Sequence, residues 1–330
     1  MARGILFILL APALAYAQLR APQVKRVGSY RTHEPADRKV LFAMAVAPDN
    51  DVLSLVAKNY GTWRLTRIRS WWDKNPTDET IDVPGIPPSG KLQMLSASVL
   101  ATTDGNFAVA IASGFTANES QRGGALENVV SSINLHEFAV KNSAHQAGIL
   151  EYFTDRDGRL VAQQTDYGSK RTPLVRAAPG VQRTIALAFF SIPSLTPAGA
   201  CHFSETLSGA SWIPHDQDCG PSLHPLLDGL RPLRDQTLPA GPPCGPAGST
   251  PDGLYRIESC SDFHRNFWGN PVVTEMHENV YRVSTGAPIG TVKETVHNTV
   301  NSRLAEHDGH DYLLVMEGGT FLKVYEIAGG

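Results

Sequence analysis

Short runs of alternating apolar and polar residues recur along most of the chain, and turns rich in Gly, Pro, Asn and Asp separate them. Runs with a period of two that are rich in β-branched and aromatic side chains are typical of β-strands. Helical periodicity is weak throughout, so the pattern predicts an all-β protein. The expected strands cover residues 40–46, 52–57, 62–68, 107–111, 184–190, 280–283, 312–316 and 321–327.

An acidic turn precedes a strand at five places along the chain. Asp-Gly is a strong hairpin signal, because Gly accepts a positive φ and Asp tolerates one while its side chain caps the backbone. Successive turns are 55, 53, 95 and 56 residues apart. The long spacing suggests that a sixth turn, near residue 205, has been lost, which gives a mean period of about 52 residues. The turn residues are Asp49, Asp104, Asp157, Asp252 and Asp308.

A repeat of this length is typical of a β-propeller blade, which holds about four short strands. The period predicts about six four-stranded blades, with seven as the alternative, in a single domain over residues 18–330. Too few residues follow Asp308 for a whole blade, so the last blade is expected to borrow an N-terminal strand around Val27–Tyr30. A pair of β-sandwich domains is the competing fold, but it would not explain a common period.

The last part of the chain has three features in common with a known group. Pro251-Asp252-Gly253 precedes a strand, residues 280–286 lead into residues 287–292, and residues 312–325 form a closing hairpin pattern. In these features residues 251–327 resemble the WD40-like and YVTN-type β-propellers of bacterial exported proteins, and the resemblance implies a propeller fold. Strict WD40 membership is not supported, because the Trp72-Asp73 dipeptide has no Gly-His partner in its blade.

The first 17 residues have the features of a secretory signal. Arg3 precedes an apolar run, and Ala15-Tyr16-Ala17 supplies small residues for cleavage before Gln18. The apolar stretch is too short for a membrane span, which needs about 20 residues. The remaining chain is therefore expected to be soluble, in the periplasm or outside the cell. Its composition, 42% hydrophobic and 18% charged, excludes general disorder, and a net charge of −3 argues against nucleic-acid binding.

Four cysteines lie within one window, at Cys201, Cys219, Cys244 and Cys260. An even number in an exported chain favours disulfides over free thiols, but three pairings are possible and the sequence does not choose among them. Pairing of nearest neighbours would close two short loops, each worth about 3 kcal/mol. Metal ligation is the alternative, although no Cys-x-x-Cys spacing supports it. The surrounding Pro-rich residues 193–251 are expected to be irregular.

The usual catalytic and phosphate-binding motifs are absent, so no catalytic residue, cofactor or metal site is predicted. Propeller enzymes can nevertheless collect His and acidic residues from several blades. The densest group of such residues comes late in the chain, and ordinary polar turns are the alternative explanation for it. It comprises His264, His277, Glu278, His297, Glu306, His307, Asp308, His310 and Asp311.

One expected loop, residues 261–270, is longer than a blade hairpin needs. It carries residue types that are enriched in binding hot spots. We expect it to project from one propeller face and to bind a partner, although its aromatic side chains could instead cover a blade edge. The candidate binding residues are Phe263, His264, Arg265, Phe267 and Trp268.

The sequence thus predicts an exported, non-catalytic β-propeller that binds a protein or a small ligand on one face. The alternative is a propeller hydrolase or lactonase with a channel site made of the late His and acidic residues. The sequence leaves the oligomeric state open.

Overall fold

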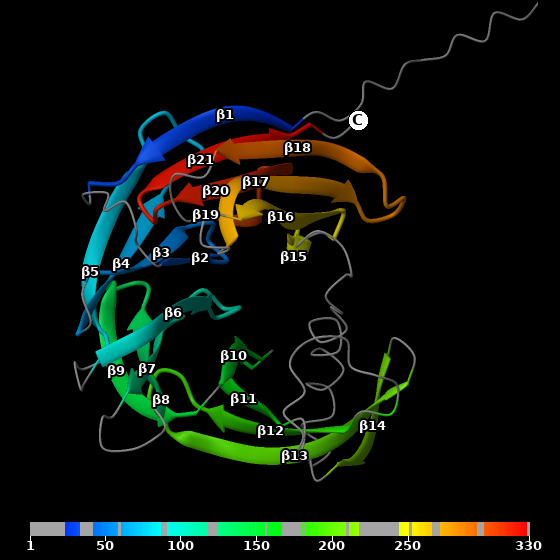
Figure 1. The fold of residues 1–330 in the computed structure, drawn as a ribbon. Coiled ribbons are helices and arrows are strands. Elements are labelled where there is room, and N and C mark those ends of the chain that lie inside the picture. Colours follow the sequence, from blue (N-terminus) through cyan, green and yellow to red (C-terminus); the bar gives the residue numbers. More distant parts are fainter. Residues whose placement is uncertain are drawn as a thin grey trace, which may run out of the picture.

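In the computed structural model every described element is a β-strand, and the strands form five sheets arranged around a ring (Figure 1). No helix in this part of the chain has the length and apolar character to cross a membrane. The structure describes residues 24–33, 42–58, 61–86, 91–117, 125–148, 150–155, 157–166, 180, 182–208, 211–217, 244–250, 253–265, 271–295 and 300–328.

Each sheet is one propeller blade of antiparallel strands that follow one another along the chain. Blade 1 contains β2 (Phe42–Val46), β3 (Val52–Ala57), β4 (Thr62–Arg69) and β5 (Thr77–Pro84). Blade 2 contains β6 (Lys91–Ala101), β7 (Phe107–Ala117), β8 (Ala125–Asn134) and β9 (Ala139–Ala147). Blade 3 contains β10 (Glu151–Thr154), β11 (Leu160–Asp166), β12 (Gln182–Phe190), β13 (Pro197–Ser208) and β14 (Ser211–Gln217). Blade 4 contains β15 (Cys244–Ser249), β16 (Tyr255–Arg265), β17 (Pro271–Arg282) and β18 (Pro288–Thr295).

Blade 5 combines the two ends of the described chain. It contains β19 (Val300–His307), β20 (His310–Glu317) and β21 (Phe321–Ile327), and β1 (Val24–Arg31) completes it as the outer strand. The β1–β21 register runs from Val24 opposite Ile327 to Arg31 opposite Phe321, and Figure 1 shows the two strands side by side. The predicted closure by an N-terminal strand is therefore confirmed.

The number of blades differs from the prediction, since the described residues form five blades rather than six or seven. No turn has been lost near residue 205, because that position lies inside the long strand β13. The long spacing between Asp157 and Asp252 arises within one enlarged blade, which has a fifth strand and is followed by residues 218–243, outside the described part. Each of the five described blades therefore contains one acidic turn.

The acidic turns share one backbone geometry. In blades 1 to 4 the turn places one residue at a φ near +70°, namely Asn50, Gly105, Gly158 and Gly253. Asp104 stabilises its turn because Oδ1 accepts the Asn106 N–H at 3.1 Å. Neighbouring turns also contact each other: the Leu135 N–H, for example, donates to the Asn106 carbonyl at 2.9 Å. Since every blade begins with its inner strand, these turns gather on one face of the ring, here named the turn face.

Apolar side chains fill the spaces between blades on both faces of each sheet. On β2, Phe42 and Met44 pack with blade 5, while Ala43 and Ala45 pack with blade 2. This alternation follows from the period-two geometry of a strand. The largest fully buried side chain, Trp63, belongs to the layer between blades 1 and 2. Both faces of each sheet are buried against neighbouring blades. Few strand positions are therefore open to charged side chains, which explains the low content of charged residues.

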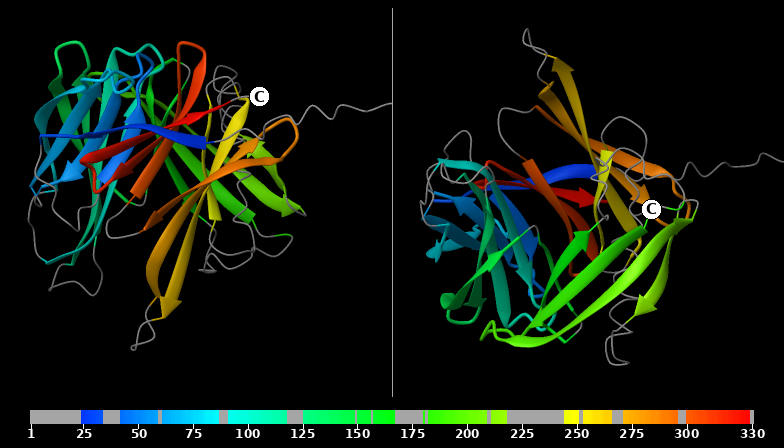
Figure 2. Two further views of the ribbon diagram at one scale, coloured as in Figure 1. Left: turned by 90° about the horizontal axis from the view of Figure 1, so that it is seen from above. Right: turned by 60° about the horizontal axis from the view of Figure 1, so that its bottom comes forward.

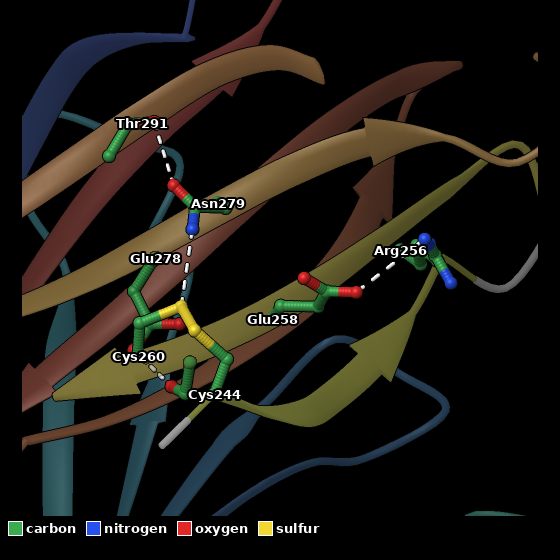
Figure 3. The surroundings of a disulfide bond; sticks show 8 residues. Cys244, Arg256, Glu258, Cys260, Glu278, Asn279 and Thr291 are labelled. Carbon is green, nitrogen blue, oxygen red and sulfur yellow. Dashed lines mark hydrogen bonds and ion pairs between the residues drawn. A yellow bond between two sulfur atoms is a disulfide. The ribbon is translucent and has the colours of Figure 1, made fainter. Parts of the chain in front are cut away.

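One of the three possible cysteine pairings gains direct support. Cys244 on β15 and Cys260 on β16 face each other in register and form a disulfide, to which Asn279 lies close (Figure 3). Cys201 is also disulfide-bonded, and Cys219 lies outside the described residues.

The expectation of an irregular segment over residues 193–251 is wrong where the structure describes it. Strands β13, β14 and β15 all lie within these residues. Along β13, burial alternates at Cys201, Phe203, Glu205 and Leu207, which is a strand pattern that the surrounding prolines obscured. Pro193 follows a cis peptide bond in the β12–β13 turn.

Candidate functional site

A pocket of about 360 Å³ opens on the turn face between blades 1 and 2. Strand β4 and four connections build it: the β2–β3 turn, the β4–β5 loop, the β6–β7 turn and the β8–β9 turn. Charged, aromatic and small residues line it together. They are Asp49, Asp51, Arg67, Arg69, Ser70, Trp72, Gly105, Leu135 and His136.

The β2–β3 turn holds two carboxylates at the pocket. Asn50 adopts a φ of 68°, and the Asp49 Oδ1 accepts the N–H of Asp51 at 3.1 Å. The Trp71 indole N–H donates to the Asn50 carbonyl at 2.6 Å, which ties this turn to the β4–β5 loop. The Asp49 carboxylate is therefore held by the backbone of its own turn.

Arg67 links the two blades beneath the pocket. Its guanidinium donates from Nε to Glu79 at 2.7 Å, and a second nitrogen donates to the Leu135 carbonyl of blade 2. It also lies over the Phe138 ring of blade 2, 4.4 Å from the ring centroid. Only 4% of the Arg67 side chain is exposed, so this cation is held in place by contacts from both blades.

Arg69 is the second cation at the pocket, and half of its side chain is exposed. Its Nη2 lies 2.8 Å from Glu79, and its Nε lies 3.6 Å from Asp51. Arg67 and Arg69 are two residues apart on β4, so their side chains extend on the same side of the sheet. Glu79 on β5 pairs with both of them.

The Asp51 carboxyl has an unusual proton affinity. Burial, together with the charge of neighbouring Asp49, raises its pKa to about 6. Arg67 and Arg69 oppose this effect, but they are shared with Glu79. A carboxyl that titrates near neutral pH inside a pocket marks a candidate functional site, although ion-pair networks in purely structural positions can do the same.

An aromatic cluster borders the pocket on the side of blade 5. The Trp72 indole stacks on His307, with ring centroids 3.8 Å apart and an interplanar angle of 21°. Trp71 meets Trp72 and Tyr312 edge to face, each at 5.2 Å. Trp72 is therefore stacked on one side by His307 and is also one of the residues that line the pocket. On the opposite wall, the His136 Nε2 lies 3.0 Å from the Asn106 Oδ1.

The predicted binding loop at residues 261–270 takes a different form. Residues 261–265 continue β16 and pair with β17, so this part of the expected loop is a strand. Figure 2 shows the β16–β17 hairpin extending beyond the rest of the ring. Phe263, His264 and Arg265 lie near its tip, while Phe267 and Trp268 lie outside the described residues. Their role in binding stays a prediction.

The late His and acidic residues do not converge on one site in the described part of the chain. His307, Asp308, His310 and Asp311 surround the β19–β20 turn. Glu278 lies on β17 and is completely buried, where it accepts a hydrogen bond from Ser259 at 2.6 Å (Figure 3). His297 lies outside the described residues, and no group of three or more potential metal-binding side chains occurs within them.

Buried charge also crosses the junction between blades 4 and 5. Burial lowers the pKa of Arg303 on β19, and the carboxylate of Glu278 on β17 counteracts part of that shift. The two groups therefore act on each other electrostatically across the junction. This position favours a role in blade packing for Glu278 rather than in a shared catalytic site.

No sequence motif marks the pocket. Its residues come from β4 and four connections in two blades, and no short motif contains them. Two features of the sequence point to this region. Arg67 stands at a position of β4 where the alternation of apolar and polar residues predicts a buried side chain, and Trp71-Trp72 is a rare aromatic pair in a polar turn.

The fold and the pocket define a five-bladed β-propeller with a charged pocket on its turn face. No protein-family model matches the sequence, and no curated protein matches it. Structural similarity was found to the mannose phosphorylase MPT-4 from Leishmania mexicana in complex with phosphate ion (11% identity, TM-score 0.29, covering 89% of this chain and 88% of that one). It was also found to TolB from Acinetobacter baumannii (12%, 0.25, 88% and 54%) and to the GDP-Man-dependent mannosyltransferase MPT-1 from L. mexicana (10%, 0.30, 90% and 90%). At these TM-scores the similarities carry no argument about function.

Proposed function

We propose that this chain is an exported, non-catalytic binding module that takes its ligand in the pocket between blades 1 and 2. The observation that carries the proposal is that the charged groups of the pocket are already held in position before a ligand binds. Arg67 is held by Glu79 and by the Leu135 carbonyl, and the carboxylates lie on a turn that the Trp71 indole secures. A site whose polar groups are already positioned loses little entropy when a ligand binds. The signal-like N-terminus and the Cys244–Cys260 disulfide support export.

Ligand-detected NMR with four sets of probes tests the binding proposal. The sets are organic cations, carboxylates, polyols and neutral aromatic compounds, each at millimolar concentration. His136→Trp narrows the pocket, whereas Glu137→Trp places the same side chain at the next exposed residue, which does not line it. At least one set should bind the wild-type protein and the Glu137→Trp control, and lose binding in His136→Trp. If no set shows this difference, the proposal is wrong.

A propeller hydrolase or lactonase is the competing interpretation. It requires the late His and acidic side chains to meet, whereas Glu278 is buried toward blade 5 and His307 stacks on Trp72. We therefore expect no turnover of ester or lactone substrates by the purified mature protein. Turnover that is lost in a His307→Ala variant would favour the enzyme instead.

A further inference from the structure

We propose that the pocket binds an organic cation, either an ammonium or a guanidinium group, with the carboxylates of Asp49 and Asp51 and the indole of Trp72 around it. This inference rests on the proposed function, because it names the class of ligand for the same pocket.

The charges at the pocket do not cancel. Asp51 and Glu79 offset the two guanidinium groups of Arg67 and Arg69, with which they form ion pairs. Asp49 is exposed and has no ion-pair partner in the part of the chain that the structure describes. One negative charge is therefore in surplus when all these groups are ionised. A bound cation would neutralise it, whereas an anion would add to it.

The donors of Arg67, and the Nη2 donor of Arg69, are already used by groups of the protein. Arg67 donates to Glu79 and to the Leu135 carbonyl, and its guanidinium plane covers the Phe138 ring. Arg69 directs Nη2 to Glu79, and half of its side chain is exposed. An anionic ligand that bound Arg67 would have to displace the partners of Arg67 and leave a carboxylate without one, which is costly in a partly buried site. The accepting groups that remain exposed favour a ligand that donates hydrogen bonds.

Trp72 supplies a second attraction of the same sign. The face of an indole carries negative potential, and it is the best of the aromatic side chains for binding a cation. His307 stacks on the Trp72 indole, and Trp72 also lines the pocket together with Asp49 and Asp51. An aromatic surface next to an unpaired carboxylate suits an ammonium or guanidinium ion better than it suits a neutral polyol.

Cation binding should be linked to the protonation of Asp51. The charged groups around it are Asp49 on its own turn, Arg67 and Arg69 on β4, and Glu79 on β5; His136 of blade 2 lines the facing wall. A bound cation stabilises the ionised carboxyl and therefore opposes the effects of burial and of Asp49 on its pKa, which lies at about 6 in the free protein. Affinity should then rise with pH through this range and become constant above it.

Isothermal titration of the full mature protein tests the proposal with three probes. Agmatine represents a free small-molecule cation, a blocked Gly-Arg-Gly peptide represents a basic protein side chain, and the same peptide with citrulline is the neutral isostere. We expect one or both cations to bind at pH 7.5 at least about fivefold more tightly than the citrulline peptide. Whichever cation binds more tightly indicates the source of the ligand.

Substitutions test whether the cation binds in the pocket. Asp49→Asn keeps the oxygen that accepts the Asp51 N–H but removes the surplus charge, and it should weaken cation binding about fivefold. Asp157→Asn is the matched control, because it makes the same change at the equivalent turn position of blade 3, away from the pocket. Between pH 5 and pH 7 the wild-type affinity should rise by up to about tenfold, and Asp51→Asn should abolish this rise.

Three results would overturn the cation proposal: equal affinity for the citrulline peptide, equal loss in Asp49→Asn and Asp157→Asn, or no cation binding at millimolar concentration. If carboxylates or polyols bind the wild-type protein and are lost in His136→Trp, the binding function stands and only the cation assignment fails. If no probe of any class binds, both fail.

Discussion

Gly319, in the β20–β21 turn, is expected to be the most sensitive glycine at the junction where the end of the chain meets its beginning. Its φ is +71°, and a Cβ at this position would lie 2.5 Å from the Val56 Cγ2 and 3.1 Å from the Phe42 Cβ. Both contacts belong to blade 1, and the Ser54 hydroxyl also donates to the Gly319 carbonyl at 2.8 Å. A side chain here would therefore strain the backbone and push blade 5 away from blade 1.

The magnitude can be separated into two parts. Placing an L-residue in the left-handed region costs about 1–2 kcal/mol, and overpacking a filled interior adds about 1–3 kcal/mol. Gly309→Ala is the matched control, since Gly309 has a φ of +75° but nothing within 4 Å of its added Cβ. We expect Gly319→Ala to lower the free energy of unfolding by about 2–5 kcal/mol and Gly309→Ala by about 1–2 kcal/mol.

Urea unfolding followed by tryptophan fluorescence measures both variants. A double variant then tests the assigned contact, because Val56→Ala removes the atom closest to the new Cβ. In that background the cost of Gly319→Ala should fall by about 1 kcal/mol or more. Equal destabilisation by the two glycine substitutions, or an unchanged cost in the Val56→Ala background, would show that the two blades are not closely packed here.

Three further predictions concern buried charge, the disulfide and pH. Arg183 and Glu205 form a buried ion pair across β12 and β13, with Nε to Oε2 at 2.7 Å. Arg183→Met should lower the free energy of unfolding by about 3–5 kcal/mol, measured by chemical unfolding, because it leaves the Glu205 charge buried without this partner. Arg183→Met combined with Glu205→Leu should lower it by less. The double variant Cys244→Ala/Cys260→Ala should lose up to about 3 kcal/mol relative to the oxidised wild-type protein, because the disulfide closes a loop of 16 residues; unaltered stability after its removal would refute the argument. The raised pKa of Asp51 means that the folded state binds its proton more tightly than the unfolded state, so its favourable contribution is complete below about pH 4 and is lost as the pH rises through about 6. Asp51→Asn should therefore be more stable than the wild-type protein by about 1 kcal/mol at pH 7.5, because solvent screens part of the effect, and the difference should vanish at pH 4 in thermal or urea unfolding.

The architecture could be predicted because it depends on local signals. Alternation marked strands such as β3 and β12, and Asp-Gly turns marked the starts of second strands such as β7. The need for an N-terminal strand followed from the few residues after Asp308. Each of these features is decided within a few residues of the chain.

The number of blades could not be predicted from the same signals. The count assumed equal spacing, but blade 3 has a fifth strand and longer connections. Loop length adds little free energy per residue, so a blade can be enlarged without disturbing its neighbours. The number of acidic turns equals the number of described blades, whereas dividing the length of the chain by a mean period does not give that number.

The pocket depends on contacts between blades, which sequence spacing does not report. Arg67 reaches Leu135 and Phe138 of the next blade, and Trp72 reaches His307 of the blade on the other side. The sequence predicts Asp49 as a turn residue, and it lies in the β2–β3 turn. Its place at a pocket depends on which other turns surround it.

The pairing of β1 with β21 sets the order in which the molecule can be completed. During synthesis β1 emerges before the strands of blades 1 to 4, and its sheet partner β21 emerges after them, so the ring cannot close until all these strands have been made. Until then β1 has no partner strand, and unpaired strand edges promote aggregation. Contacts between such distant residues also slow folding. A chain of this design benefits from being kept unfolded until it is released, as happens when a protein crosses a membrane before it folds.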